Sequence, residues 1–181
     1  LLALSRLQAG SATPRSDWVS IEDLISAAAD SARGRRPRLR VTVGQDVPEV
    51  RADAAQLERA FANLLENAGR YGGDEQIDVT ARRDHGSVLV TVTDHGGGIE
   101  LAEQARIFEP FYRGRDASRA WAGSGLGLAI VKGFVEANGG SITVRSRPGE
   151  GTSFIISLPL PERNRASEPA ATDRGTAGVA P

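Results

Sequence analysis

Two asparagines spaced four residues apart are the first side chains in this sequence that could do chemistry. Asn63 and Asn67 fall in a segment with helical spacing of its apolar residues, so both are expected on one face of a helix, and Arg70 continues that stripe. Amide oxygens suit Mg²⁺, which takes oxygen ligands together with the phosphates of a substrate. An isolated pair of this kind is more often a solvated polar face, so the choice depends on other motifs.

An aspartate followed by glycines is the second candidate. Asp94 ends a predicted strand and precedes Gly96, Gly97 and Gly98. A carboxylate there could accept a hydrogen bond from the exocyclic amine of adenine, and the glycines would let backbone approach the ring closely. A plain turn after a strand explains this motif, taken alone, equally well.

A glycine-rich stretch before a predicted helix is the third candidate. Gly123, Gly125 and Gly127 lead into it, and the free N–H groups at a helix N-terminus can bind phosphate. No Gly-Lys-Ser/Thr follows and no strand leads directly into the glycines, which excludes the Walker A loop and the dinucleotide-binding fingerprint. A flexible hinge remains the alternative.

An aromatic segment, Phe108–Arg113, lies between the second and third motifs. Its aromatic side chains are expected to pack in the core or to anchor a neighbouring loop. Without other information, Arg113 would be a surface arginine.

Four motifs in this order resemble the ATP-binding domain of bacterial sensor histidine kinases, within the wider family of gyrase, the Hsp90 chaperones and MutL. The motifs are Asn63–Ala68, Asp94–Gly98, Phe108–Arg113 and Gly123–Leu128. The resemblance implies a Bergerat-type ATP-binding fold with Mg²⁺ and ATP as cofactors.

The resemblance also implies roles for individual residues. Asn63 and Asn67 would be the magnesium and phosphate residues, and Asp94 would recognise adenine and so favour ATP over GTP. Arg113 would reach the γ-phosphate, which makes it catalytic together with the two asparagines.

Further contacts with the nucleotide follow from the same resemblance. Arg70 would touch phosphate, Tyr71 would pack against the nucleotide, and the turn before Thr152 would pack behind the pocket. The complete expected set of cofactor-binding residues is Asn63, Asn67, Arg70, Tyr71, Asp94, Gly96, Gly98, Ile99, Phe108, Gly123, Gly125, Leu126, Gly127, Leu128 and Thr152.

The elements that must position these residues follow from periodicity and capping signals. Helices are predicted from Ser20 to about Arg33, from Asp53 to Tyr71, over 101–108 and from Gly125 to Asn138. Strands or extended pieces are predicted over 17–21, 38–43, 48–52, 76–83, 87–94, 141–146 and 152–158. This order fits an α/β two-layer sandwich, a mixed sheet of about five strands with three main helices on one face.

Composition limits the partners. The 181 residues carry a net charge of −1, no basic block and no cysteine, so no nucleic-acid surface, disulfide or thiolate metal site is expected. No apolar stretch is long enough to span a membrane. The sequence contains no methionine, which indicates a fragment of a longer protein.

Three regions are expected along the chain. Residues 1–13 resemble the end of the dimerisation and phosphoacceptor helical hairpin, 14–160 would be the ATP-binding catalytic domain, and 161–181 a disordered tail. The resemblance places the domain in the cytoplasm, as part of an inner-membrane sensor protein that forms a homodimer.

The predicted function is that of a protein-histidine kinase domain in a two-component system. It would transfer the γ-phosphate of ATP to a histidine on a separate helical domain, which then phosphorylates a response regulator. His85 and His95 lack the surroundings of that acceptor, so this fragment alone should not autophosphorylate. Residues such as LSRLQAG, Trp18 and FANLLENAGRYGG indicate the potassium-responsive Kdp type.

Three alternatives remain open at this point. An ATP-driven conformational switch of the gyrase and chaperone kind would carry a glutamate where Asn63 stands, and an amide cannot act as a general base. A pseudokinase would bind nucleotide without transfer. A serine kinase acting on an anti-sigma partner is a further possibility.

Overall fold

The computed structural model describes residues 15–32, 38–72, 75–114 and 124–161. Its main sheet has five strands in the order β2-β4-β5-β7-β6. The strands are β2 (Leu39–Val43), β4 (Ile77–Asp84), β5 (Ser87–Asp94), β7 (Thr152–Pro159) and β6 (Ser141–Ser146). β2 runs parallel to β4 and every other neighbouring pair is antiparallel, so the sheet is mixed, as predicted.

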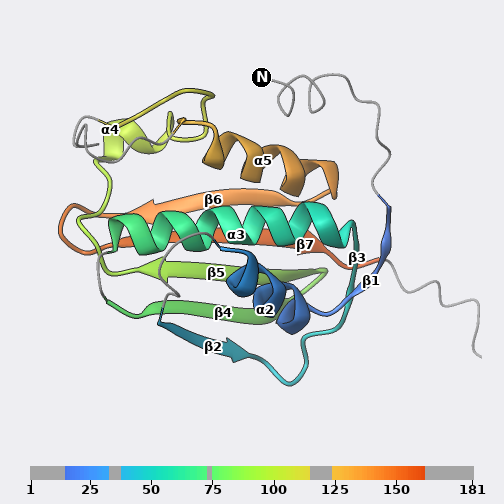
Figure 1. Ribbon diagram of the computed structural model, residues 1–181. Helices are drawn as coiled ribbons and strands as arrows, with labels where there is room; N and C mark the ends of the chain where they lie inside the picture. Colours follow the sequence, from blue (N-terminus) through green and yellow to red (C-terminus); the bar gives the residue numbers. More distant parts are fainter. Residues whose placement is uncertain (1–14, 33–37, 73–74, 115–123, 162–181) are drawn as a thin grey trace, which may run out of the picture.

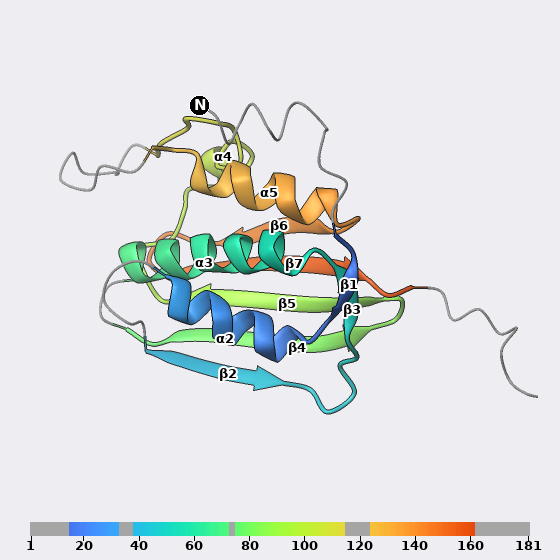
Figure 2. The ribbon, with the colours of Figure 1, turned by 45° about the vertical axis from the view of Figure 1, so that its right-hand side comes forward.

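Three of the described helices cover one face of this sheet, and no described helix covers the other face (Figures 1 and 2). They are α2 (Ile21–Ser31), α3 (Ala54–Tyr71) and α5 (Gly127–Ala137). The short α4 (Leu101–Gln104) lies beyond the sheet, near the N-terminal end of α5. The predicted two-layer α/β sandwich is confirmed.

Alternation along the central strands decides which side chains meet the helices. In β5, Val88, Val90, Val92 and Asp94 are buried, whereas the residues between them are only half-buried. In β7 the same alternation buries Thr152 opposite Asp94. A carboxylate therefore takes the last place in an apolar row that faces the helix layer.

Helix α3 is the central element of the helix layer and has the predicted bounds. Asp53 caps it by accepting a hydrogen bond from the Gln56 N–H at 3.1 Å. Its apolar stripe is buried against the sheet and the neighbouring helices: Leu57, Phe61, Leu64, Leu65 and Ala68. Asn63 and Asn67 border that stripe, as expected, and are half-buried.

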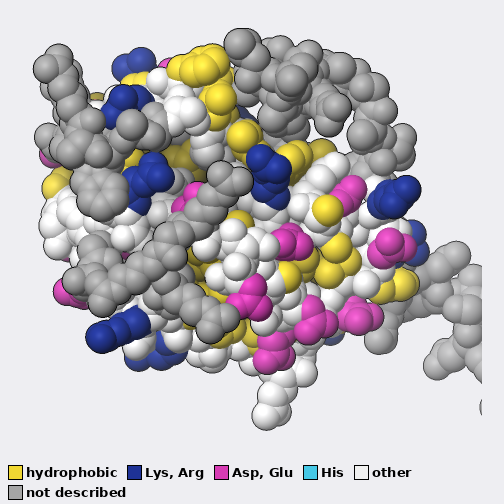
Figure 3. All heavy atoms as spheres, viewed as in Figure 1, with side chains coloured by type: hydrophobic (Ala, Val, Ile, Leu, Met, Phe, Trp, Pro, Cys, Tyr) yellow, Lys and Arg dark blue, Asp and Glu magenta, His cyan; other side chains and the backbone are white. Residues whose placement is uncertain are grey.

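Helix α2 is amphipathic in the same way. Its buried side consists of Ile21, Leu24, Ile25 and Ala28, and Glu22, Asp23 and Asp30 are exposed. Acidic side chains accordingly gather over α2 on the face shown in Figure 3. Within the described ranges no helix is both long and apolar enough to cross a membrane.

Some predicted bounds were wrong for physical reasons. The helix expected over 101–108 ends at Gln104, and the chain continues to Tyr112 mainly in turns with hydrogen bonds three residues apart. Gly125 has φ +69°, which is incompatible with a right-handed helix, so α5 begins at Gly127 instead. The predicted extended segments 17–21 and 48–52 form a separate antiparallel pair, β1 (Asp17–Val19) with β3 (Val50–Ala52).

Asn138 connects the end of α5 to the start of α3. Its Oδ1 accepts from the Asp53 N–H at 2.7 Å, and its Nδ2 donates to Gln56 Oε1 at 3.1 Å and to the Phe134 carbonyl at 2.8 Å. One partly buried amide therefore makes three hydrogen bonds that fix the two helices relative to each other.

Replacing this amide should destabilise the fold. We expect Asn138→Ala to lower the free energy of unfolding by about 2 kcal/mol, because it removes three hydrogen bonds and leaves the Asp53 N–H without its partner. Urea denaturation measures the difference. Glu136→Ala on the exposed side of the same helix is the control and should change stability by less than about 0.5 kcal/mol. Equal effects of the two variants would contradict this role.

Candidate functional site

A cavity of about 330 Å³ lies where α3 and β5 end and β7 begins, beside the start of α5. Seven of the predicted site residues line it: Asn67, Tyr71, Asp94, Gly98, Ile99, Leu128 and Thr152. They come from five parts of the chain between residues 67 and 152, so the fold brings the separate sequence motifs together.

Asp94 is the buried charged group of this cavity. Only 5% of its surface is exposed, and its Oδ1 accepts from the Gly96 N–H at 3.0 Å. Burial raises the pKa of this carboxyl, while hydrogen bonds from backbone N–H groups of Gly96 and Thr152, and the charge of His95, act in the opposite direction. An ionised carboxylate accepts at about four lone-pair positions, so Asp94 retains capacity for a ligand donor.

Glycines around Asp94 allow close contact between protein segments. A Cβ added to Gly96 would lie 2.1 Å from the Tyr71 carbonyl oxygen, and one on Gly98 would lie 2.0 Å from the Arg147 carbonyl oxygen. From the sequence, these glycines were expected to let the backbone approach the adenine ring closely. In the structure they let the loop pack against the end of α3 and against the turn after β6.

Ser146 and Gln104 fix the wall beside Asp94, and sequence reasoning did not single them out. The Ile99 N–H donates to Ser146 Oγ at 2.8 Å, and that hydroxyl lies 2.7 Å from the Gly151 carbonyl oxygen. Gln104 Nε2 donates to the Ile99 and Ser146 carbonyls, at 2.9 Å each. The bonds from Ile99 and Gln104 to Ser146 join residues 47 and 42 apart in the sequence, so no local signal could have shown them.

Asn63 and Asn67 face the first turn of α5. A Cβ on Gly127 would lie 3.9 Å from Asn63 Oδ1 and 4.0 Å from Asn67 Nδ2, which is van der Waals contact with both amides. Asn63 Nδ2 is buried and has no hydrogen-bond partner among the residues that the structure describes. A buried orphan amide is costly, and rotation by 180° would present oxygen in place of nitrogen, so this position fits a polar or cationic ligand.

The glycine before α5 is held by the aromatic segment. The Phe111 N–H donates to the Gly125 carbonyl at 2.9 Å, and both residues have positive φ, 64° and 69°. A Cβ on Gly125 would lie 2.8 Å from the Phe111 backbone, so only glycine fits. This contact fixes the approach to α5.

The other predicted residues lie around the cavity or outside the description. Arg70 is half-buried in the last turn of α3, and Arg113 is exposed. Phe108 does not line the cavity but packs edge-on against Phe154, which does, with ring centroids 6.3 Å apart. Leu126 directly precedes α5, and Gly123 falls outside the described residues.

Several lining residues were not predicted as site residues: Gly97, Glu100, Glu103, Ile107, Tyr112, Gly114, Pro148 and Phe154. Tyr112 Oη donates to Glu103 Oε1 at 3.1 Å, and the Arg106 guanidinium lies 4.5 Å from the Tyr112 ring centroid. Most of these residues belong to irregular segments, where periodicity gives no information.

Comparison with known proteins agrees with this geometry. Residues 52–162 match the family described as histidine kinase-, DNA gyrase B-, and HSP90-like ATPase. The chain is similar to the alginate biosynthesis sensor protein KinB of Pseudomonas aeruginosa, 38% identical over 88% of this chain and 27% of that protein. It is also 38% identical to the sensor protein KdpD of Mycobacterium tuberculosis H37Rv, over 90% of this chain and 19% of that protein.

Solved structures show the same likeness. The mycobacterial sensor histidine kinase MprB is 33% identical with a TM-score of 0.69, over 80% of this chain and 97% of that one. Full-length ShkA in complex with AMPPNP is 31% identical with a TM-score of 0.75, over 87% of this chain and 34% of that one. The chain therefore belongs to the histidine kinase-, DNA gyrase B- and HSP90-like ATPase family, as an ATP-binding domain of the sensor histidine kinase type. It spans about a fifth to a quarter of the length of KdpD and KinB.

The close packing around Asp94 can be tested at a neighbouring glycine. Gly151 has φ +83°, and its added Cβ would lie 2.1 Å from the Asp94 carbonyl oxygen. Gly149 has φ +79° and open space. We expect Gly149→Ala to lower the free energy of unfolding by about 1–2 kcal/mol from backbone strain, and Gly151→Ala by more than about 3 kcal/mol. Urea denaturation gives both values. Similar losses in the two variants would show that packing on Asp94 does not constrain this turn.

Proposed function

We propose that this domain binds Mg-ATP in the cavity beside Asp94 and supplies the γ-phosphate to a histidine on a separate helical domain. The observation that carries the proposal is a buried carboxylate at one side of the cavity with the amide-bearing face of α3 at the other. ShkA, a relative of similar fold, was solved in complex with AMPPNP, an ATP analogue.

Asp94 supports the choice of adenine over guanine. Two backbone N–H groups hold its carboxylate, and the remaining acceptor positions suit the 6-amino group of adenine. Guanine carries an oxygen at that place, so its approach would put two acceptors together at a buried site. Such a mismatch leaves polar groups unpaired and discriminates strongly.

Asn63 and Asn67 are the residues that would hold Mg²⁺. The orphan amide of Asn63 and the two facing amides fit a cation with oxygen ligands. A bound Mg²⁺ would neutralise charge on the phosphates. The start of α5 offers backbone N–H groups to the same phosphates, and Arg70 offers a positive charge.

Other residues of the chain would orient the nucleotide and exclude water. Tyr71 lines the cavity with 56% of its surface exposed, so its ring is available for contact with a ligand. Tyr112 and Glu103 form a hydrogen-bonded part of the wall. We assign Arg113, which is exposed three residues after Pro110, to the γ-phosphate.

The partners belong to the same proposal. The acceptor would be a separate helical domain of the same protein, and a response regulator would receive the phosphate. Residues 1–13 and 162–181, expected to be the end of that domain's hairpin and part of a tail, lie outside the described residues. The full protein would be a membrane-bound homodimer with this domain in the cytoplasm. KinB, SenX3 and KdpD relatives are 37–38% identical, so identity does not single out the Kdp type, which stays a prediction.

Transfer is favoured over ATP-driven switching by the residue at position 63. That position lies beside the start of α5, and an amide there cannot accept a proton from water. Little hydrolysis of ATP is therefore expected, and the γ-phosphate is kept for an acceptor.

Recognition of the adenine base by Asp94 can be tested by comparing two nucleotides. We expect wild-type protein to bind Mg-ATP at least about tenfold more tightly than Mg-GTP, and Asp94→Asn to lose most of that preference, because an amide can donate to guanine O6. Isothermal calorimetry with both nucleotides measures this. Equal binding of ATP and GTP by the wild type, or no binding, would rule out the assigned pocket and favour a degenerate module.

A single substitution tests metal binding and phosphate transfer together. Asn67→Ala should weaken Mg-ATP binding and lower phosphate transfer to a separately supplied acceptor-histidine domain by more than about tenfold, since it removes a ligand used by metal and phosphate. Radiolabelled ATP and the two purified domains give the rate. The exposed Glu136→Ala variant is the control. Wild-type protein that binds ATP tightly yet labels no acceptor domain would favour the pseudokinase alternative.

A further inference from the structure

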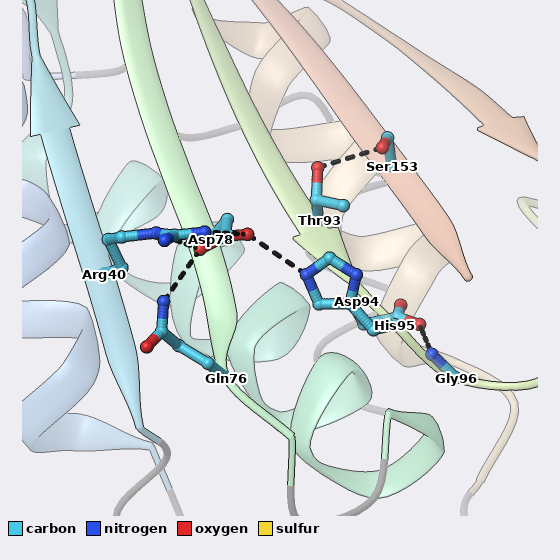
Figure 4. Close-up of polar contacts among 8 residues, drawn as sticks. All are labelled: Arg40, Gln76, Asp78, Thr93, Asp94, His95, Gly96 and Ser153. Atoms are coloured by element: carbon cyan, nitrogen blue, oxygen red, sulfur yellow. Dashed lines mark hydrogen bonds and ion pairs between the residues drawn. The ribbon is translucent and has the colours of Figure 1, made fainter. Parts of the chain in front are cut away.

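His95 follows Asp94 directly, and its side chain lies on the opposite side of the sheet. Asp94 is buried toward the helices, whereas the His95 ring meets Asp78 on the open face (Figure 4). Successive residues of an extended chain point to opposite faces, so contacts on the two faces hold the same short piece of backbone.

Backbone pairing does not secure this piece on the side of β4. The ladder between β4 and β5 ends at the pair Asp78–Thr93, one residue before Asp94 and two before His95. The His95 Nε2–Asp78 Oδ2 contact, at 3.0 Å, continues that connection through side chains. The far part of the loop is held differently, since the Gly149 N–H donates to the Gly97 carbonyl at 2.8 Å.

Asp78 is itself held firmly. The Arg40 guanidinium on β2 donates to both its oxygens, at 2.8 and 3.0 Å, and Gln76 Nε2 donates at 3.1 Å. Hydrogen bonds from Arg40, Gln76 and His95 keep the pKa of Asp78 well below its usual range, so this carboxylate stays ionised. An ionised carboxylate only accepts, so His95 Nε2 carries the hydrogen.

We propose that His95 is a positioning residue for adenine recognition. Its bond to Asp78 fixes the loop that presents the Asp94 carboxylate and the Gly96 N–H. Without that hydrogen bond the backbone from Asp94 to Gly96 is held less firmly, and the Asp94 carboxylate then adopts more than one orientation. This inference rests on the proposed function, because it concerns the residue assigned to adenine.

The chain offers a matched control in its other histidine. His85 lies in the turn between β4 and β5, also contacts an aspartate, Asp84 at 3.3 Å, and has 98% of its side chain exposed. It lies at the opposite end of the same two strands, so its removal should leave the cavity unchanged.

The first experiment measures Mg-ATP and Mg-GTP binding by calorimetry for His95→Ala, His95→Gln and His85→Ala. We expect His95→Ala to weaken ATP binding about three- to tenfold, with a smaller change for GTP. His95→Gln should restore ATP affinity to within about twofold, because its amide can donate to Asp78 from a similar position. His85→Ala should have no effect.

The second experiment needs no nucleotide. The amide proton resonance of Gly96 reports its bond to the Asp94 carboxylate, so it should shift in His95→Ala and return in His95→Gln. Asp78→Ala should give the same shift, and adding His95→Ala to that background should change little, because both variants remove one contact.

Opposite results would overturn the inference. One such result is a His95→Ala variant whose ATP affinity and Gly96 resonance are both unchanged. The others are a His95→Ala variant that loses affinity for ATP and GTP equally, and a His95→Gln variant that does not regain ATP affinity. Asp94→Asn distinguishes failure of the proposed role of His95 from failure of the proposed function. If it abolishes base preference while His95→Ala does not, only the role of His95 fails. If it leaves base preference unchanged, the proposed function fails first.

Discussion

Burial of one carboxylate is the constraint on which the site depends. Asp94 occupies the last place in a row of valines, so a charged group stands where β-sheet alternation requires a side chain facing the helices. A carboxylate at such a place is costly unless donors surround it. Backbone N–H groups of Gly96 and Thr152 supply that environment, and both come from segments whose course is fixed by the same alternation in β5 and β7.

Close backbone contact provides the rest of the environment. Gly96 and Gly151 each bring the backbone of one segment against another around Asp94, at separations that no Cβ permits. Peptide groups therefore approach the residue and its following loop from the end of α3 and from the turn before β7. Close-packed backbone has few alternative arrangements, which favours a fixed geometry at the site.

The regular parts of this arrangement could be predicted from the sequence. Asn67 and Asp94 lie in elements with clear periodicity, and the order of the motifs in the sequence indicates one pocket. The walls built by Tyr112 and Pro148 could not be predicted, because they lie in irregular segments whose course depends on hydrogen bonds between distant parts of the chain. The loop glycines were correctly predicted to allow a close approach. Their spacing does not show whether a ligand or another protein segment approaches, and in the structure it is protein backbone.

Helix α5 has two unlike ends. Its fully buried side chains, Val131 and Val135, lie in its middle and last turn, and Asn138 attaches its C-terminal end to the start of α3. The first turn, by contrast, is only half-buried and lies against the amides of α3. The helix is therefore anchored more firmly at its C-terminal end than at its first turn. If it moves, its displacement should be larger beside the cavity than at the junction with α3.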